Sequence, residues 1–323
     1  MDSTDKLYVI AVISNPVGYE SRYRLYRNFE KHMRQSGAEL ITVELATGNQ
    51  EFAVTNFYNK NHIQLRTDSV LWYKENLINI GFSALPTDYK YVAWIDADIT
   101  FINPDWVQET INALENYKIV QMFATVFDLN AAGESMSISN SFGSMYVRNN
   151  CVVPPVRVNE ITKRSKDNGG IYTGTKFWHP GYAWAATRNT IEATNGVMDF
   201  PIMGSADHLM ALSLVGETDR INHLDLSSGY VDCIHCWEKN ALNFVNGQIG
   251  YVPGSIAHHF HGKKINRGYH NRTQVLIDYQ YNPSTDIRKD KKGLVHLIVE
   301  DDRQLALQNA LIEYFKSRKE DEK

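Results

Sequence analysis

The stretch Lys90-Tyr91-Val92-Ala93-Trp94-Ile95-Asp96-Ala97-Asp98-Ile99-Thr100-Phe101 decides how the rest of the chain is interpreted. Its apolar run predicts a buried strand, and two carboxylates, Asp96 and Asp98, follow where the strand leaves the core. Alternate strand positions point the same way, so both carboxylates can face one spot. Two like charges this close are costly unless a cation lies between them. Because carboxylate oxygens suit Mg²⁺ and Mn²⁺, the stretch predicts a divalent metal site that can bridge the phosphates of a nucleotide.

The composition is that of an ordinary globular protein, and 323 residues leave room for one large domain. The net charge of −4 provides no general basic surface that would indicate nucleic-acid binding. The three cysteines (Cys151, Cys233 and Cys236) are an odd number, which argues against a disulfide framework and favours free thiols. The apolar run Leu7–Ile13 is too short for a signal peptide or a membrane span, so no transmembrane segment is expected.

Strand-like and helix-like segments alternate along the first part of the chain. Strands are expected over Leu7–Ile13, Glu39–Leu45 and Ile119–Phe127, and helices over Ser21–Met33, Thr67–Ile80 and Asp105–Glu115. This order predicts a mostly parallel sheet with helices on both faces. Asn130–Gly174 is less regular and is expected to be an insertion or a loop over the site, while Asp301–Lys319 has a helical pattern. We therefore expect a main domain over residues 1–275 and an extension over 276–323 that ends in a helix.

An aromatic block, Trp178-His179-Pro180-Gly181-Tyr182-Ala183-Trp184-Ala185, is a candidate for substrate contacts. Gly181 permits close approach of the backbone to a ligand. Trp178, Tyr182 and Trp184 offer flat faces on which a sugar could stack, although the same side chains could belong to the core. Alternation places Tyr182 and Trp184 on one face.

A carboxylate near a helix start provides a second candidate. Gly204-Ser205-Ala206-Asp207-His208 predicts a loop that opens a helix over Leu209–Leu214. Asp207 would lie near the N-terminus of that helix, where a negative charge is stabilised. It is therefore either an ordinary helix cap or a functional acid with His208 as its neighbour.

Three histidines and several cations gather in the stretch Ile256–Tyr269. Strand spacing would put His259 and His261 on one face and His258 on the other. The polar residues that follow are candidates for contacts to a leaving diphosphate, where cations stabilise developing charge: Lys263, Lys264, Asn266 and Arg267.

Together these motifs resemble the GT-A type of metal-dependent nucleotide-sugar glycosyltransferases, and in particular soluble ones encoded by bacteria and phages. The segments that carry the resemblance are Trp72-Tyr73-Lys74-Glu75-Asn76-Leu77, Trp94-Ile95-Asp96-Ala97-Asp98, Gly181-Tyr182-Ala183-Trp184-Ala185, Gly204-Ser205-Ala206-Asp207-His208 and His261-Gly262-Lys263-Lys264-Ile265-Asn266-Arg267. The turn after Ile95 is similar to the Asp-x-Asp signature of that family. The resemblance implies a GT-A (Rossmann-like) α/β fold, with a mostly parallel central sheet flanked by helices and a C-terminal helical extension.

The resemblance also implies a metal site and a base. Asp96 and Asp98 would hold Mn²⁺ or Mg²⁺ against the donor diphosphate, with a histidine as third ligand, His259 preferred over His261. Asp207 would take the proton of the acceptor hydroxyl as that oxygen attacks the anomeric carbon. This role favours inversion at the anomeric carbon, whereas the histidine motif is commonest in retaining families, so both outcomes stay open.

The donor expected from the resemblance is a nucleotide-diphosphate sugar, with a UDP-sugar favoured. Its nucleotide would lie over the ends of the first strands. The residues expected to contact the donor are Ile13, Ser14, Asn15, Arg66, Lys74, Asp96, Lys263, Lys264, Asn266 and Arg267. Those expected to contact substrate are Trp178, Gly181, Tyr182, Trp184 and His208. Because no anchor is visible, the resemblance implies a cytoplasmic enzyme, bacterial or phage-encoded within the host.

The acceptor and the oligomeric state are left open. Candidate acceptors are a glycan, a protein, a small molecule, or a hydroxymethylated pyrimidine of phage DNA reached as an extruded base. Other functions compatible with paired aspartates are a nucleotidyltransferase and a non-catalytic module that binds nucleotides or glycans. The first lacks support because Ser14–Gly18 is not a glycine-rich basic loop, and the second because the acidic and histidine residues are intact.

Overall fold

The structure, a computed structural model, describes residues 5–153, 172–221, 225–268 and 272–322. The strands are β1 (Leu7–Ser14), β2 (Glu39–Thr47), β3 (His62–Thr67), β4 (Tyr91–Ile95), β5 (Ile99–Phe101), β6 (Ile119–Gln121), β7 (Thr125–Leu129), β8 (Ser135–Ser141), β9 (Tyr172–His179), β10 (Ala183–Thr187), β11 (Ile249–Tyr251), β12 (Ser255–His258), β13 (Ile287–Lys289) and β14 (Val295–Leu297). The α-helices are α1 (Glu20–Gln35), α2 (Lys74–Ser83), α3 (Trp106–Leu114), α4 (Phe142–Arg148), α6 (Arg188–Thr194), α7 (Ala206–Ser213), α8 (Ser228–Phe244), α9 (Arg272–Asp278), α10 (Pro283–Asp286) and α11 (Asp302–Ser317). Short 3₁₀ turns cover Thr218–Ile221 and Lys264–Arg267.

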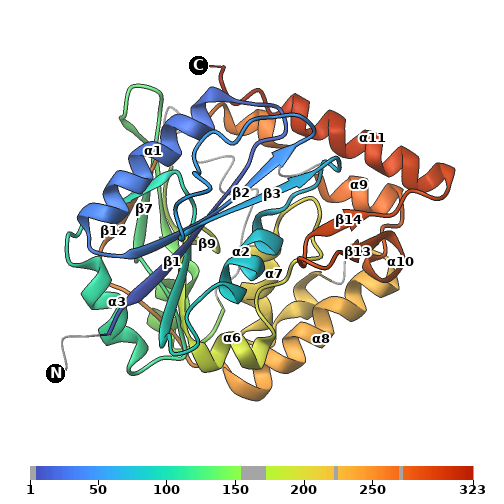
Figure 1. Cartoon of the computed structure of the whole chain (residues 1–323). Coiled ribbons are helices and arrows are strands. Elements are labelled where there is room, and N and C mark those ends of the chain that lie inside the picture. Colours follow the sequence, from blue (N-terminus) through green and yellow to red (C-terminus); the bar gives the residue numbers. More distant parts are fainter. Residues whose placement is uncertain (1–4, 154–171, 222–224, 269–271, 323) are drawn as a thin grey trace.

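A seven-stranded central sheet has the order β11-β6-β10-β4-β1-β2-β3. Its pairs are parallel except at β10, which runs antiparallel to both of its neighbours, β4 and β6. Figure 1 shows helices on both sides of this sheet. The prediction of a mostly parallel central sheet flanked by helices is confirmed.

Side chains of one strand divide between the two faces of the sheet. Ile10 of β1 packs in a core cluster with residues of α2, whereas its neighbours Val9 and Ala11 pack in a second cluster with residues of α1. Alternation along a strand that is buried on both sides produces this division. It explains why β1 is apolar at nearly every position.

A second sheet of five strands has the order β5-β12-β7-β8-β9. In it His258 of β12 lies opposite Ile99 of β5 on one side and Asp128 of β7 on the other. Because Ile99 directly follows Asp98, this pairing brings the turn after β4 next to the histidine stretch. The second sheet is therefore the element that assembles the candidate site.

Three local expectations differ from the structure. The expected strand Ile119–Phe127 is two strands, β6 and β7, because the chain passes from one sheet to the other between Gln121 and Thr125. The expected helix start at Thr67 is the end of β3, and α2 begins only at Lys74. Asn130–Gly174 contains β8, α4 and the beginning of β9, while residues 154–171 lie outside the described residues.

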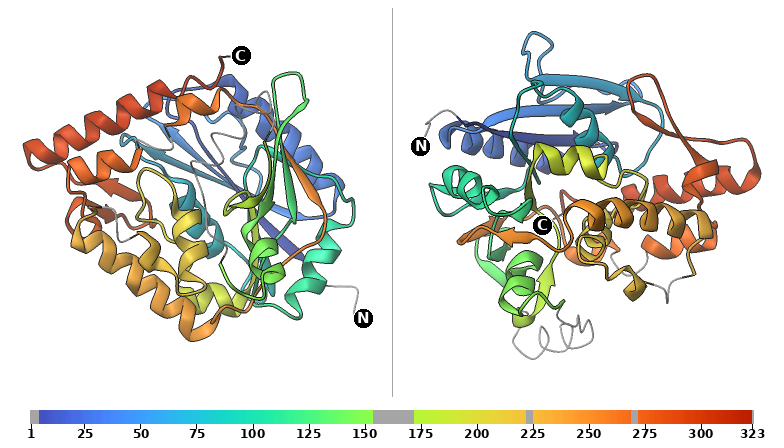
Figure 2. Two further views of the ribbon diagram at one scale, coloured as in Figure 1. Left: turned by 180° about the vertical axis from the view of Figure 1, so that it is seen from behind. Right: turned by 90° about the horizontal axis from the view of Figure 1, so that it is seen from below.

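The C-terminal part packs into the same core as the main sheet. Leu276, Leu294, Leu307 and Leu311 belong to the cluster that contains Ile10. α11 lies beside α9, and the chain beyond α11 returns to α1 (Figures 1 and 2). The predicted C-terminal helix is confirmed, and the domain boundary at residue 275 stays a prediction. In the described residues, no helix has the length and apolarity needed to cross a membrane.

Candidate active site

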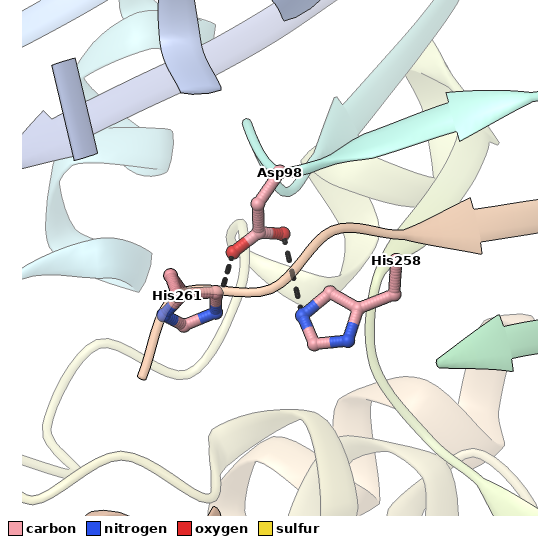
Figure 3. Close-up of side chains that lie close together, drawn as sticks. All are labelled: Asp98, His258 and His261. Carbon is pink, nitrogen blue, oxygen red and sulfur yellow. Dashed lines mark ion pairs between the residues drawn. The ribbon is translucent and has the colours of Figure 1, made fainter. Parts of the chain in front are cut away.

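The turn Asp96-Ala97-Asp98 connects β4 to β5 and directs its two carboxylates to different neighbours. The backbone N–H of Asp96 donates to the carbonyl of Tyr182 at 2.7 Å, which ties the turn to the start of β10. Asp98 is buried, and its Oδ2 lies 3.0 Å from Nε2 of His261. Its Oδ1 lies 3.8 Å from Nε2 of His258. Figure 3 shows the Asp98 carboxylate between the two imidazole rings.

These three buried side chains have the geometry of a metal site. One ligand atom from each of Asp98, His258 and His261 can be chosen so that all lie within 4.8 Å of one another. Oδ1 of Asp98 has no hydrogen-bond partner among the described residues, which leaves a buried carboxylate oxygen available to a cation. A carboxylate with two imidazoles suits Mn²⁺ and other transition ions better than Mg²⁺, which prefers oxygen ligands. The residues present therefore fit a divalent metal.

Electrostatics keep the Asp98 carboxyl ionised. Burial by itself would raise its pKa, but the two imidazoles and Arg22 lower the pKa of Asp98 well below its ordinary value. Arg22 lies 3.9 Å from Oδ2 of Asp98. Sequence patterns gave no reason to select Arg22, which lies on the amphipathic helix α1.

His258 is held by a carboxylate that sequence reasoning missed. Nδ1 of His258 lies 2.8 Å from Oδ1 of Asp128, a buried residue of β7. Asp128 also accepts hydrogen bonds from Tyr182 at 3.1 Å, Ser137 at 2.7 Å and Lys264 at 2.7 Å. This network leaves Nε2 of His258 on the side of Asp98. No local sequence motif marks Asp128. It is identified by the pairing of β7 with β12, which places it opposite His258.

His259 lies elsewhere. Its Nε2 is 2.8 Å from the hydroxyl of Thr100, and its backbone N–H donates to the carbonyl of Asp98 at 2.8 Å. The sequence analysis left His258 out of the metal site because strand alternation placed it on the opposite face from His259 and His261. β12 ends at His258, so the alternation does not extend to His261, and the structure groups His258 and His261 with Asp98.

Asp96 points to the other side of the turn, where it pairs with Lys74. Its Oδ1 lies 2.5 Å from Nζ of Lys74, the first residue of α2. Burial raises the pKa of Asp96 against the opposing effect of Lys74. Thus the two aspartates belong to two adjacent sites, one with histidines and one with a lysine.

A pocket lies on the Lys74 side of the turn. It is lined by Lys74, Glu75, Ile78, Trp94, Gly181, Tyr182, Trp184, Asp207 and Met210. Gly181 is packed closely against Asp207, since a Cβ added there would lie 2.3 Å from Oδ2 of Asp207. No other residue fits at position 181 without moving the carboxylate. Gly181 and Asp207, which the sequence selected separately, thus line the same pocket, and their roles stay predictions.

Asp207 lies in the first turn of α7, and it is half-buried. Its Oδ1 accepts a hydrogen bond from the backbone N–H of His208 at 2.9 Å. Burial opposes ionisation, but Lys74 and His179 lower the pKa of Asp207 below its ordinary value. Asp207 is therefore an ionised carboxylate in a pocket, an arrangement compatible with both a helix cap and a proton acceptor.

Backbone strain marks two positions beside this pocket. Tyr182 has φ +76° and Ser205 has φ +73°, both in the left-handed region that side chains disfavour. Such positions cost roughly 1–3 kcal/mol each and occur often at functional sites. The carbonyl of Tyr182 holds the Asp96 turn, and Ser205 precedes α7, so both strained residues position the carboxylates of the site.

The predicted aromatic contacts are more buried than stacking on a sugar requires. Trp178 stacks on His208 with ring centroids 5.2 Å apart, and it is fully buried. The indole N–H of Trp184 donates to the carbonyl of Pro180 at 2.7 Å. Tyr182 and Trp184 nevertheless line the pocket, while Trp178 and His208 are not among its lining residues.

The donor-site candidates near the N-terminus divide into separate environments. Ile13 is buried, Ser14 is half-buried, and Asn15 closes its own loop through hydrogen bonds with Tyr19. Arg66 is exposed on β3 and donates to the carbonyl of Gly48.

The candidates after the histidines also differ from one another. Lys263 is exposed, Asn266 is half-buried, and Arg267 is buried. Lys264 is bound to Asp128 rather than directed at an open site. The donor role of all these residues stays a prediction.

Glu75 is a buried acid of the pocket that sequence reasoning did not select. Burial raises the pKa of its carboxyl to about 8, against the opposing effect of Lys74. It lies next to Lys74 in the first turn of α2. A protonated carboxyl at this place can donate a hydrogen bond as well as accept one.

Comparisons with known proteins show similarity in structure but not in sequence. No protein-family model matches the chain, and no curated protein matches it by sequence. Among solved structures, the catalytic domain of Drosophila β1,4-galactosyltransferase 7 in complex with xylobiose is 10% identical, with a TM-score of 0.41; 94% of this chain and 98% of that chain are covered. Residues 1–349 of S. aureus TarS in complex with UDP-GlcNAc are 10% identical, with a TM-score of 0.45; 97% and 73% are covered.

A third similar structure is 4-diphosphocytidyl-2C-methyl-D-erythritol synthase from Anaerococcus prevotii. It is 12% identical, with a TM-score of 0.36, and 77% of this chain and 89% of that chain are covered.

Proposed function

We propose that the chain is a glycosyltransferase that moves a sugar from a nucleotide-diphosphate sugar to an acceptor hydroxyl. The observation that carries this proposal is the two-sided turn: a buried carboxylate–histidine group lies on one side and an ionised acid in a pocket on the other. Transfer from such a donor needs both functions close together, because the diphosphate leaves while the acceptor loses a proton. The motif resemblance and the α/β fold agree with this reaction.

The metal ligands in this proposal are Asp98, His258 and His261. A divalent ion held by them would neutralise charge on the leaving diphosphate. We propose Mn²⁺ rather than Mg²⁺ because two of the ligands are imidazoles. Arg22 faces the same carboxylate and could add positive charge next to the diphosphate.

Asp207 is the proposed base. The acceptor oxygen attacks the anomeric carbon, the bond from that carbon to the diphosphate oxygen breaks, and the hydroxyl proton passes to Asp207. The proposed product is inverted at the anomeric carbon. Lys74 also lines the pocket, and its charge stabilises the ionised form of Asp207 before the acceptor binds.

The donor is proposed to be a UDP-sugar, and the acceptor class stays open between a glycan, a protein, a small molecule and a modified DNA base. The pocket itself supports a hydroxyl-bearing substrate, since it is lined by the carboxylate of Asp207 and the carboxyl of Glu75. Such groups bind hydroxyls through hydrogen bonds.

A ligand panel tests the proposal. Thermal unfolding is measured with Mn²⁺ and each of a set of nucleotide-diphosphate sugars, and slow hydrolysis of the donor is followed in parallel. We expect stabilisation by one donor class, dependent on Mn²⁺ and accompanied by release of the nucleoside diphosphate. Stabilisation with release of pyrophosphate from a nucleoside triphosphate would instead indicate a nucleotidyltransferase.

The adjacent histidines provide a matched pair for the same assay. His258→Ala removes a proposed ligand, whereas His259→Ala removes a ring that contacts Thr100. We expect the Mn²⁺-dependent stabilisation to disappear in the first variant and to persist in the second. The opposite result would transfer the ligand role to His259, as the sequence predicted.

A further inference from the structure

Both histidines of the candidate metal site have a carboxylate behind them. Nδ1 of His258 lies 2.8 Å from Asp128, and Nδ1 of His261 lies 3.5 Å from Oε2 of Glu320. In both rings the other nitrogen, Nε2, is the one that faces Asp98. Each ring thus has a carboxylate on its Nδ1 side, supplied by a segment distant in the sequence, and of the two carboxylates Asp128 is the one within hydrogen-bond distance.

Glu320 belongs to the tail that follows α11, and it is fixed in place. Its side chain is buried and pairs with Arg22, whose Nη2 donates to Oε1 at 2.8 Å. Arg318 donates to the same oxygen at 2.5 Å. The backbone of the tail also contacts the histidine loop, because a Cβ added at Gly262 would lie 2.8 Å from Cα of Glu320. The carboxylate is therefore held against His261 from several sides.

Contacts with α1 anchor the same tail. Asp321 accepts hydrogen bonds from the backbone N–H groups of Glu20 at 3.0 Å and Ser21 at 2.9 Å, at the N-terminus of the helix. A negative charge is favourable at this end of a helix. The hydroxyl of Tyr19 donates to the carbonyl of Phe315 at 3.0 Å. The tail is thus docked by contacts that are independent of the histidine.

We propose that Glu320 is a positioning residue of the metal site, which orients His261 as Asp128 orients His258. A carboxylate that accepts from Nδ1–H fixes the tautomer with a lone pair on Nε2, directed at the metal. The 3.5 Å separation from His261 exceeds a typical hydrogen bond of about 2.9 Å, and the positioning role requires the two groups to approach when His261 binds a metal. This inference rests on the proposed metal site, and it makes the tail part of that site.

A different role for Glu320 has the opposite consequence. If its carboxylate only occupies Arg22 and Arg318 in place of a diphosphate, it competes with the donor. Removing it would then strengthen anion binding and leave metal binding unchanged. The two roles are therefore distinguished by which ligand responds.

The experiment measures Mn²⁺ affinity of the full chain without nucleotide, by calorimetry and by electron paramagnetic resonance. Glu320→Ala is expected to weaken Mn²⁺ binding about 10–100-fold, the range found when carboxylates behind metal-bound histidines are removed. Glu320→Gln keeps an oxygen that can accept from Nδ1–H, so it should bind Mn²⁺ more tightly than Glu320→Ala. Both variants leave the same arginines without their carboxylate, so the difference between them reports on His261.

Glu322→Gln is the matched control. Glu322 is exposed on the same tail and pairs with Lys319 at 3.2 Å. We expect wild-type Mn²⁺ affinity from this variant. Thermal unfolding of all variants shows whether the tail substitutions affect the fold itself.

A spectroscopic measurement separates positioning from general stabilisation. Nitrogen NMR of the protein loaded with diamagnetic Zn²⁺ should show His261 with its proton on Nδ1, and Glu320→Ala should remove the hydrogen-bonded shift of that Nδ1–H. Inorganic pyrophosphate is titrated in parallel, and its affinity should not rise in Glu320→Ala.

The outcomes are separable from those of the proposed function. Absence of Mn²⁺ binding by the wild-type chain would remove the metal site and this inference together. Wild-type binding that is unchanged in Glu320→Ala and Glu320→Gln would overturn the positioning role alone. A gain in pyrophosphate affinity with unchanged Mn²⁺ affinity would identify Glu320 as a competitor instead.

Discussion

Asp96 and Asp98 are two residues apart in one turn, yet they lie in opposite chemical surroundings. Asp98 faces two imidazoles and Arg22, which lower the pKa of its carboxyl. Asp96 faces Lys74 at 2.5 Å, and burial raises the pKa of its carboxyl. The difference shows that two identical residues of one short motif need not share one task. We interpret the Asp98 side as the metal side and the Asp96 side as the side of the base.

Asp96 and Asp98 have different surroundings because β4 ends before it reaches them. The strand ends at Ile95, so the alternation that would have aligned the two carboxylates stops before either of them. The hydrogen bond from Asp96 to Tyr182 then holds the turn against β10. The sequence predicted both aspartates as metal ligands; in the structure Asp98 lies beside the histidines and Asp96 pairs with Lys74.

The strongest test of the division compares Asp98→Asn with Asp96→Asn. Asp98→Asn should abolish measurable Mn²⁺ binding, because it removes the charged ligand between the two histidines. Asp96→Asn should retain Mn²⁺ binding, because its partner is Lys74. Calorimetric titration of both variants measures this. Loss of Mn²⁺ binding in both would show that the two aspartates bind the same metal.

The second test addresses the base. Asp207→Asn should bind donor and Mn²⁺ normally but transfer the sugar about 10²–10⁴-fold more slowly, as expected for removal of a general base. The acid limb of the wild-type rate should lie below pH 3.8, because the pKa of Asp207 is lowered from that value. Single-turnover rates and the anomer of the product check this. Transfer near the wild-type rate, or a retained anomer, would leave Asp207 only as a helix cap.

The third test uses Glu75 on the Lys74 side. Its pKa is about 8 in the folded chain against 4.5 in an unfolded one, so the folded state binds the proton more tightly between these values. The free energy of unfolding should therefore fall as pH rises from 4.5 to 8, by at most about 1.4 kcal/mol per pH unit. Glu75→Gln should lack this slope. Urea unfolding of both proteins between pH 5 and 8 measures it, and equal slopes would contradict the buried, protonated state.

The smallest expected effect concerns Lys264, which pairs with Asp128 at 2.7 Å and whose side chain is 46% exposed. A partly exposed ion pair contributes about 1 kcal/mol or less, so Lys264→Ala should weaken Mn²⁺ binding by no more than about fivefold. The substitution Lys263→Ala, at the exposed neighbouring residue, is the control. A larger loss in Lys264→Ala would show that Asp128 depends on this lysine to hold His258.

Much of the fold follows from the sequence because it depends on long periodic segments. The apolar runs of β1 and β4, and the helical pattern of α11, each contain enough residues to identify their type. The short strands β3 and β12 were missed or extended, because four to six residues carry little periodicity. The antiparallel insertion of β10 depends on pairing between distant segments, which no local pattern encodes.

The candidate site likewise contains some residues that the sequence could predict and others that it could not. Asp98, His261, Gly181 and Asp207 belong to recognisable motifs, and the structure brings Asp98 to His261 and Gly181 to Asp207. Arg22, Asp128 and Glu320 come from elements with ordinary amphipathic or strand patterns, so the sequence offers no signal for them. The choice between His258 and His259 depended on where one short strand ends, which a single sequence does not determine.

The position of β10 has a consequence for folding. β4 and β6 precede it in the chain, and in the sheet both pair with β10 and not with each other. Until β10 inserts, both strands present an unpaired edge, and exposed apolar edges promote association between partly folded chains. β10 and the residue before it also supply Trp184 and Tyr182 to the pocket lining, so the pocket is complete only when β10 is in the sheet. Substitutions that slow this step would therefore reduce the yield of soluble protein before they change the activity of the molecules that fold.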